Sequence, residues 1–233
     1  MSESLPVVFL PGTLCDERVW LPVWQRLDIA DRRYVPLQWA ETLEQMTGLT
    51  EHAVEDEKVH LIGFSLGGYI AALYALANPQ NIASLTLIGF NPRGLPEKEM
   101  QQRQDLIKRL QLGKVKPMNT ARLNQFIDAQ HPQADTIRQQ IQEMEQDLGN
   151  AVLKYQLQAA SERGDMIAAL NGCTFPINIV AAEHDKIAPS QALHQAQQKI
   201  SASQWWPISQ SGHMMPLEQP QVLADLLQQI IQG

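Results

Sequence analysis

The chain has 233 residues, 44% of them hydrophobic, and a formal net charge of −7 that comes from 25 acidic and 18 basic side chains. Its length suits one domain, or one domain with a large insertion, and is sufficient to bury a full core. The acidic balance, without any run of Lys or Arg, excludes proteins that bind nucleic acid or anionic membranes through a basic surface.

Targeting and cysteine patterns are both weak. No apolar segment approaches the length of a membrane span, and Met1-Ser-Glu-Ser lacks the basic region of a signal peptide. Cys15 and Cys173 show no metal-ligand spacing, so neither a disulfide framework nor a zinc site is predicted. We expect a cytoplasmic monomer or small homo-oligomer with no nucleic-acid or membrane partner.

Residues 1–90 alternate short apolar runs with helical patterns. Continuous apolar runs are typical of strands that are buried on both faces of a parallel sheet. Strands alternating with helices in this rhythm predict an α/β fold with right-handed crossovers. The expected strands are Leu5–Leu10, the weaker Arg33–Leu37, Lys58–Gly63 and Ile82–Ile88, and the expected helices are Asp16–Leu27, Leu43–Val54 and Gly67–Ala77.

The pattern changes at Asn91, where Pro92, Gly94 and Pro96 interrupt the chain. From there to residue 171 the sequence is helical in period, rich in Gln, Glu, Arg and Lys, and has no strand pattern. The helices expected in this segment are Glu97–Leu112, Ala121–Ala129, Ala134–Leu148 and Ala151–Arg163. The pattern then returns to expected strands at Ile177–Ala182 and Ser203–Ile208, and to expected helices near Ser190–Lys199 and Pro220–Ile231.

The stretch from Val59 to Ala72 passes from a strand into a helix through Gly63-x-Ser65-x-Gly67. A sharp turn at this point needs its glycines, because the serine backbone is strained and strand and helix pack too closely to admit a Cβ. The turn lifts the Ser65 hydroxyl above the sheet edge, with the positive end of the helix beneath it. This stretch resembles the nucleophile elbow of the α/β-hydrolase family. A structural turn without chemistry is the alternative.

The resemblance covers the whole chain apart from the inserted helices. It implies an α/β-hydrolase fold with a minimal, mainly parallel sheet of six strands, because too few residues precede Leu5 for the two leading strands of larger members. In this family, an insertion after the fourth of these strands usually forms a cap over the site. We therefore expect a discontinuous core, residues 1–90 and 172–233, and a helical cap, residues 91–171. A second helical layer without a lid role is the alternative.

Elbow enzymes carry their acid and base after later strands, in the order Ser, Asp or Glu, His. Among six histidines, His213 fits this order, because it follows the expected strand Ser203–Ile208 and precedes the last helix. Gly212-His213 also resembles the catalytic-histidine motif of the family. The other histidines precede the elbow, lie in helical segments or adjoin the acid candidate: His52, His60, His131, His194 and His184.

The acid is expected in the loop after Ile177–Ala182. The family pattern there, Gly-x-x-Asp-x-(Ile/Val)-x-Pro, matches Asp185, Ile187 and Pro189. The resemblance therefore implies that Asp185 is the acid of the triad. Glu183 is the alternative acid.

The resemblance also implies two backbone N–H groups that hold the oxyanion. One belongs to Leu66, directly after the nucleophile. The other belongs to Thr13, in the loop Pro11-Gly12-Thr13 after the first strand. Pro11 replaces the usual histidine of the family, but the donating N–H is retained.

The activity implied by these residues is acyl transfer to water without a metal or organic cofactor. The short layout is similar to small bacterial carboxylesterases, including those that act on acyl-carrier methyl esters. We expect a small-molecule ester with a small- to medium-chain acyl group as substrate. Arg93 would hold a carboxylate or phosphate, and Phe64 and Met214 would line the pocket. A solvated or ion-paired Arg93 and plain core packing of the other two are the alternatives.

Other activities on the same triad stay open. The chain also looks like the menaquinone-pathway lyase, which eliminates an acid with a similar Ser-Asp-His set, and like ring-cleavage C–C hydrolases. Perhydrolases share the serine elbow, whereas haloalkane dehalogenases need Asp where Ser65 stands. A ligand-sensing protein that retains the triad is the alternative of another class.

Overall fold

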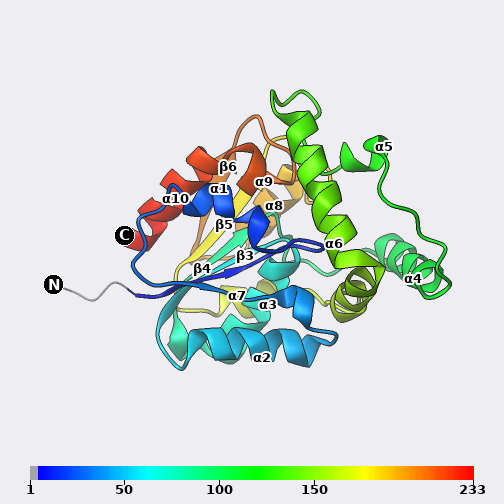
Figure 1. Cartoon of the computed structure of the whole chain (residues 1–233). Helices are drawn as coiled ribbons and strands as arrows, with labels where there is room; N and C mark the ends of the chain where they lie inside the picture. Colours follow the sequence, from blue (N-terminus) through cyan, green and yellow to red (C-terminus); the bar gives the residue numbers. More distant parts are fainter. Residues whose placement is uncertain (1–4) are drawn as a thin grey trace.

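The computed structural model describes residues 5–233 and contains one six-stranded sheet in which all neighbouring strands are parallel (Figure 1). The strand order is β2-β1-β3-β4-β5-β6, which places β3 in the interior of the sheet beside β1. The strands are β1 Val7–Leu10, β2 Arg32–Tyr34, β3 Val59–Phe64, β4 Ile82–Ile88, β5 Ile177–Ala182 and β6 Ser203–Ile208.

Helices cover both faces of this sheet, with α2 and α3 on one side and α1 and α10 on the other (Figure 1). The helices before the fifth strand are α1 Leu21–Trp24, α2 Leu43–Val54, α3 Leu66–Ala77, α4 Glu97–Gln111, α5 Thr120–Leu123, α6 Ala134–Ala160 and α7 Ile167–Asn171. Those after it are α8 Ser190–Gln197, α9 Met215–Glu218 and α10 Pro220–Gln232. Short 3-10 helices are formed by Glu17–Val19, Leu37–Trp39 and Pro79–Asn81.

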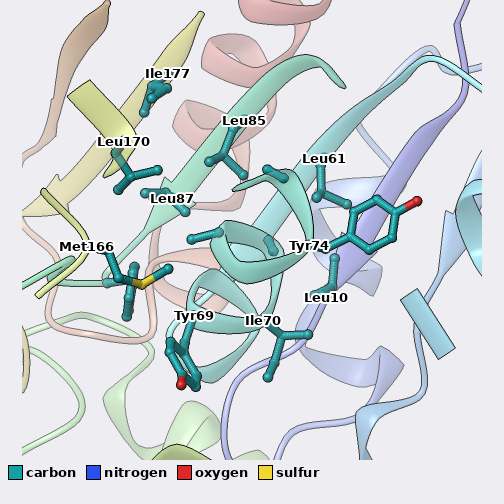
Figure 2. Packing of buried hydrophobic residues seen from close by; sticks show 14 of the residues in the cluster. Leu10, Leu61, Tyr69, Ile70, Tyr74, Leu85, Leu87, Met166, Leu170 and Ile177 are labelled. Carbon is teal, nitrogen blue, oxygen red and sulfur yellow. The ribbon is translucent and has the colours of Figure 1, made fainter. Parts of the chain in front are cut away.

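Two apolar layers fill the space between sheet and helices, because successive strand residues point to opposite faces. Val8 and Leu10 of β1 belong to the layer that α2, α3 and α8 cover, whereas Val7 and Phe9 belong to the layer beneath α1 and α10. Figure 2 shows the first layer around α3. Since all strands are parallel, the loops after their carboxyl ends meet along one edge of the sheet, and a site is expected there.

All six predicted strands are present, but the strand predicted for Arg33–Leu37 is too long, because β2 ends at Tyr34 and a 3-10 helix begins at Leu37. Strands Ile82–Ile88, Ile177–Ala182 and Ser203–Ile208 have the predicted bounds, and six parallel strands form the whole sheet. The helix predicted from Asp16 to Leu27 is wrong, because this segment forms a 3-10 helix and then the four-residue α1. Pro22 lies in the first turn of α1, where its missing N–H is tolerated, whereas within a longer helix it would break the hydrogen-bond ladder. The short helices α7 and α9 were not predicted, since they are too short to show periodicity.

Residues 91–171, which we call the inserted segment, contain α4, α5, α6 and α7 between β4 and β5. Helix α6 is interrupted at Gly149, whose φ of 75° and ψ of 176° separate it into the two helices predicted there. The helix predicted for Ala121–Ala129 is too long, because α5 ends at Leu123. Beyond Leu123 the chain turns, and backbone groups of residues 124–128 bond to loops of the sheet instead.

Among residues 5–233, no helix combines the length and the apolar character needed to cross a bilayer.

Candidate active site

Ser65 lies at the turn between β3 and α3 in a strained conformation with a φ of 52° and a ψ of −109°. Such a conformation is costly for a residue with a Cβ and persists only where its surroundings enforce it. A Cβ on Gly63 would collide with the carbonyl of Gly67, and one on Gly67 with the carbonyl of Leu10. The strand, the helix and the loop after β1 therefore hold the Ser65 turn tightly.

A chain of two hydrogen bonds joins Ser65, His213 and Asp185. The Ser65 Oγ lies 3.0 Å from His213 Nε2, and His213 Nδ1 lies 2.8 Å from Asp185 Oδ2. The three residues follow β3, β6 and β5, so the parallel sheet brings together positions that are far apart in the sequence. The side chain of Asp185 is fully buried and that of His213 is only 4% exposed. Low solvent access strengthens both hydrogen bonds.

Asp185 fixes the proton arrangement of His213. Its Oδ1 accepts the backbone N–H groups of Ile187 at 2.7 Å and Ala188 at 2.8 Å, which holds the carboxylate in one orientation. Because the other oxygen accepts from His213 Nδ1, the neutral imidazole carries its proton on that nitrogen. His213 Nε2 then presents a lone pair to the Ser65 hydroxyl. The arrangement can deprotonate the serine during attack on a carbonyl.

The loop after β1 lies against the serine, since a Cβ built on Gly12 would be 3.4 Å from the Cβ of Ser65. Within residues 5–233, the backbone N–H groups of Thr13 and Leu66 find no hydrogen-bond acceptor. Leu66 begins α3, so its N–H has no partner inside the helix and lies at the positive end of the helix dipole. Both predicted oxyanion donors are thus free to bind a negatively charged oxygen.

Residues 124–128 of the inserted segment, which we call the 124–128 loop, bind both loops that carry the acid and the base. Toward the acid loop, Lys186 Nζ donates to the Asn124 carbonyl at 3.0 Å, and His184 Nδ1 lies 2.8 Å from Asp128 Oδ2. Toward the histidine loop, the Met214 N–H donates to the Phe126 carbonyl at 3.0 Å. Asp185 and His213 each lie in a short sequence motif, and hydrogen bonds from the inserted segment hold the loops that carry them.

Glu218 also joins the 124–128 loop to the histidine loop. Its Oε1 accepts the N–H of Asp128 at 2.6 Å and that of Gly212 at 3.0 Å, and its Oε2 accepts the Ser211 hydroxyl at 3.3 Å. Burial raises the pKa of Glu218, and the N–H donors partly offset that rise. One buried carboxylate therefore ties the inserted segment to the residue directly before His213.

The three predicted substrate contacts have different surroundings. Phe64 and Met214 are 1% and 4% exposed and belong to the apolar layer beneath α1 and α10. The Phe64 ring packs 5.1 Å, centroid to centroid, from that of His213. Arg93 is half-buried, and its backbone N–H donates to Asn91 Oδ1. Packing around the base thus accounts for the two apolar residues.

The sequence analysis missed three residues that the structure brings near the site: Gln156, Arg163 and Glu218. Glu218 lies only five positions after His213, but the motif that singles out His213 does not include it. Gln156 and Arg163 had no signal in the sequence, because they lie in helical sequence rich in polar residues and contact parts of the chain that are distant in the sequence.

Two other features resemble functional sites: a second Ser–His pair and a hollow beside the acid loop. His60 Nδ1 lies 2.8 Å from Ser84 Oγ, which makes a second Ser–His pair, and no hydrogen bond to a carboxylate from residues 5–233 extends it. A hollow of about 480 Å³ is lined by residues 128–130 and 183–186. Asp185 is among these residues, but its carboxylate is buried and bonded to His213. In the described part of the chain, no group of three or more His, Cys, Asp or Glu is arranged to hold a metal ion.

Comparison with known proteins bears on the family and the fold. Residues 7–226 match the model of a family described as "Alpha/beta hydrolase family". The fold is similar to that of a thermophilic esterase from Thermogutta terrifontis, with a TM-score of 0.83 and 20% identity over 98% of this chain and 89% of that one. It is also similar to an esterase from Exiguobacterium antarcticum, with a TM-score of 0.80 and 19% identity over 100% and 94% of the two chains.

One curated relative matches along nearly its whole length. It is the 2-succinyl-6-hydroxy-2,4-cyclohexadiene-1-carboxylate synthase of Enterobacter sp. (strain 638), which is 26% identical over 97% of this chain and 91% of its own. Two other curated relatives match over 37 and 78 residues only, and the matched parts span 13% and 20% of their lengths.

Proposed function

This chain belongs to the alpha/beta hydrolase family, and on that premise we propose that it hydrolyses carboxylic esters with small- to medium-chain acyl groups. The observation that carries the proposal is the hydrogen-bonded chain from the strained Ser65 through His213 to the buried Asp185. A serine hydroxyl is a poor nucleophile until a positioned base takes its proton, and this arrangement supplies that base.

The proposed reaction has two halves. His213 Nε2 takes the Ser65 proton as Oγ attacks the ester carbonyl, and the N–H groups of Thr13 and Leu66 hold the oxyanion. Collapse of this intermediate breaks the bond to the alcohol, which leaves with the proton from His213. Water then attacks the acyl-serine, gives its proton to His213, and releases the acid and the free serine.

Hydrolysis of p-nitrophenyl esters from acetate to palmitate tests the proposal. We expect turnover with a maximum at a short or medium chain, and a loss of at least about 1000-fold in kcat for Ser65→Ala and His213→Ala. Ser84→Ala is the matched control, because it removes the serine of the Ser–His pair that has no acid, and its kcat should stay near that of wild type. A wild type that reacts with a fluorophosphonate probe at Ser65 but turns over no ester of the series would contradict the esterase assignment.

Arg163 favours a second candidate, action on a substrate that carries a carboxylate. Its guanidinium lies 5.4 Å from the centroid of the Phe90 ring, and its Nε is buried without a hydrogen-bond partner among residues 5–233. Burial first and the charge of neighbouring Arg103 second lower the Arg163 pKa to about 10, while Glu99 and Tyr69 act in the opposite direction. Phe90 adjoins Gly89, where an added Cβ would lie 3.1 Å from the His213 ring. A half-buried guanidinium that forms no salt bridge among residues 5–233, this near His213, suits a substrate carboxylate.

The relative from Enterobacter is in keeping with this candidate, since its printed name describes a carboxylate-bearing product. A matched pair of substrates separates the two candidates: p-nitrophenyl butyrate, which is neutral, and mono-p-nitrophenyl succinate, which adds a carboxylate to the same chain length. If Arg163 binds an acid, Arg163→Met should raise KM for the succinate ester by about tenfold or more and leave butyrate unchanged.

Arg93→Met is the control for this pair, because Arg93 was the arginine predicted from the sequence. Equal effects of both variants on both esters would exclude a specific carboxylate site at Arg163. Turnover in ¹⁸O-labelled water distinguishes hydrolysis from elimination, since only hydrolysis puts the label into the product acid.

A further inference from the structure

Gln156 of α6 forms a hydrogen bond between the inserted segment and the loop after β1. Its side chain is buried, with 1% of the residue exposed. The Oε1 atom accepts the backbone N–H of Leu14 at 2.9 Å, across 142 positions of sequence. Leu14 directly follows Thr13, which is one of the two proposed oxyanion donors. This bond therefore acts on the part of the chain that must hold the reacting oxygen.

The orientation of the Gln156 amide is fixed by that contact. A backbone N–H can bond only to an acceptor, so the amide oxygen of Gln156 faces Leu14. The NH₂ group of the same amide therefore points away from the Leu14 N–H. The Nε2 atom is buried and has no hydrogen-bond partner within residues 5–233. Buried amide donors without a partner are rare because they have lost their hydrogen bonds to water. Since Oε1 and Nε2 belong to one amide group, this free donor lies beside the loop after β1.

The backbone of the loop explains why such support is needed. Leu14 has a φ of 51°, which is unfavourable for a residue with a side chain. Three contacts hold this conformation: the Cys15 N–H donates to the Gly12 carbonyl at 3.2 Å, the Cys15 thiol lies 3.5 Å from the Thr13 carbonyl oxygen, and Gln156 binds the Leu14 N–H. Rotation of the peptide between Thr13 and Leu14 would turn a carbonyl toward the place of the N–H and disturb the neighbouring Thr13 donor. Gln156 opposes that rotation.

We propose that Gln156 has two roles in the esterase reaction proposed above, on which this inference rests. Its Oε1 is a positioning group that holds the oxyanion loop through Leu14. Its Nε2 binds the substrate directly, by donating a hydrogen bond to an oxygen on the acyl chain. The substrate class assigned by this geometry is the ester of an oxygen-substituted short acid, such as an alkoxy-, hydroxy- or oxo-acid, in preference to a plain alkanoate.

A pair of nearly isosteric substrates tests the substrate role: p-nitrophenyl methoxyacetate and p-nitrophenyl butyrate, which differ by an ether oxygen in place of a methylene. Gln156→Met keeps the length of the side chain but removes both its donor and its acceptor. We expect its ratio of kcat/KM, methoxyacetate over butyrate, to fall about five- to tenfold below that of wild type, because one hydrogen bond is lost. The comparison of ratios cancels the different intrinsic reactivity of the two esters. Gln158→Met, on an exposed position of the same helix, is the matched control.

Hydrogen exchange of the Leu14 amide tests the positioning role without any substrate. In folded Gln156→Met, this amide should exchange at least about tenfold faster than in wild type, while amides of β3 keep their rates. The substrate-binding role can also be tested by NMR on the wild type alone. The Gln156 side-chain NH₂ resonances should shift on addition of methoxyacetate and not on addition of butyrate.

Unchanged exchange at Leu14 would overturn the positioning role, and an unchanged substrate ratio together with unshifted NH₂ resonances would overturn the binding role. If the wild type hydrolyses no ester, the proposed function fails, but exchange at Leu14 still decides whether Gln156 holds the loop.

Discussion

The sheet and the inserted segment contribute to the candidate site in different ways. The sheet supplies the hydrogen-bonded set of Ser65, Asp185 and His213, since each of them stands in a turn or loop after a strand. The inserted segment supplies contacts that hold these loops, through the 124–128 loop, through Asp128 bound to Glu218, and through Gln156 bound to Leu14. Its partners lie 90 and 142 positions away in these last two cases. The residues of the proposed chemistry are thus specified by local sequence motifs, whereas the positions of their loops depend on contacts between distant parts of the chain.

The largest effect is expected from the buried acid of the sheet. Asp185→Asn keeps the shape of the side chain but removes the charge that stabilises a protonated His213 and selects its tautomer, so kcat should fall by about 10⁴-fold. Steady-state hydrolysis of the best p-nitrophenyl ester measures this loss. Glu183→Gln is the control, because Glu183 was the other acid candidate and its Oε2 accepts the Gln210 N–H and lies 4.0 Å from His184 Nε2, away from His213 Nδ1, which bonds to Asp185. A similar loss in Glu183→Gln would overturn the assignment of the acid.

A smaller but clear effect is expected where the two regions join at Glu218. Glu218→Ala leaves the N–H groups of Gly212 and Asp128 without their acceptor and should lower the free energy of unfolding by roughly 2–4 kcal/mol. It should also reduce kcat by about tenfold or more, because Gly212 directly precedes the base. Urea unfolding and kcat measure the two effects.

Glu218→Gln is the matched variant. Its amide oxygen can still accept both N–H groups, and its NH₂ group can donate to the Ser211 hydroxyl, so stability should stay within about 1 kcal/mol of wild type. Equal losses in the Ala and Gln variants would show that the charge of Glu218, and not its hydrogen bonds, stabilises the junction.

The pH dependence of stability should reveal the buried state of Glu218. Because burial raises its pKa in the folded protein above the usual 4.5, the folded chain holds this proton more strongly than the unfolded chain does. The contribution of Glu218 to stability is therefore fully present below pH 4.5 and is lost as pH rises through the folded pKa. Glu218→Gln has no such proton, so its stability relative to wild type should rise between about pH 4 and pH 7. A difference between the two proteins that is constant over this range would contradict the raised pKa.

The contrast between the two regions also explains which features of the fold and the site could be predicted from the sequence. The parallel sheet and the Ser65, Asp185 and His213 positions follow from strand patterns and from motifs of a few residues. Gln156 and Arg163 show no such pattern. In the sequence, a Gln that becomes buried and an Arg that becomes half-buried look like the many solvated ones around them, until the fold brings Leu14 and Phe90 beside them. The overlong helix prediction at residues 121–129 has the same cause. Local propensity favours a helix there, and hydrogen bonds to the catalytic loops favour the turn that is observed.

The smallest expected effect concerns the two free cysteines of the chain, Cys15 and Cys173. Cys15 is buried in the loop after β1, where burial first and the Asp16 charge second raise its pKa to about 12. Cys173 follows the inserted segment and is partly exposed, and burial raises its pKa as well. At pH 8 a thiol reagent should modify Cys173 first and Cys15 at least about 100-fold more slowly, because the latter must wait for the loop to open. Catalysis should not change on modification of Cys173. If Gln156 holds the loop, Gln156→Met should speed the reaction of Cys15 and leave that of Cys173 unaltered, so the slow thiol reports directly on the contact between the inserted segment and the sheet.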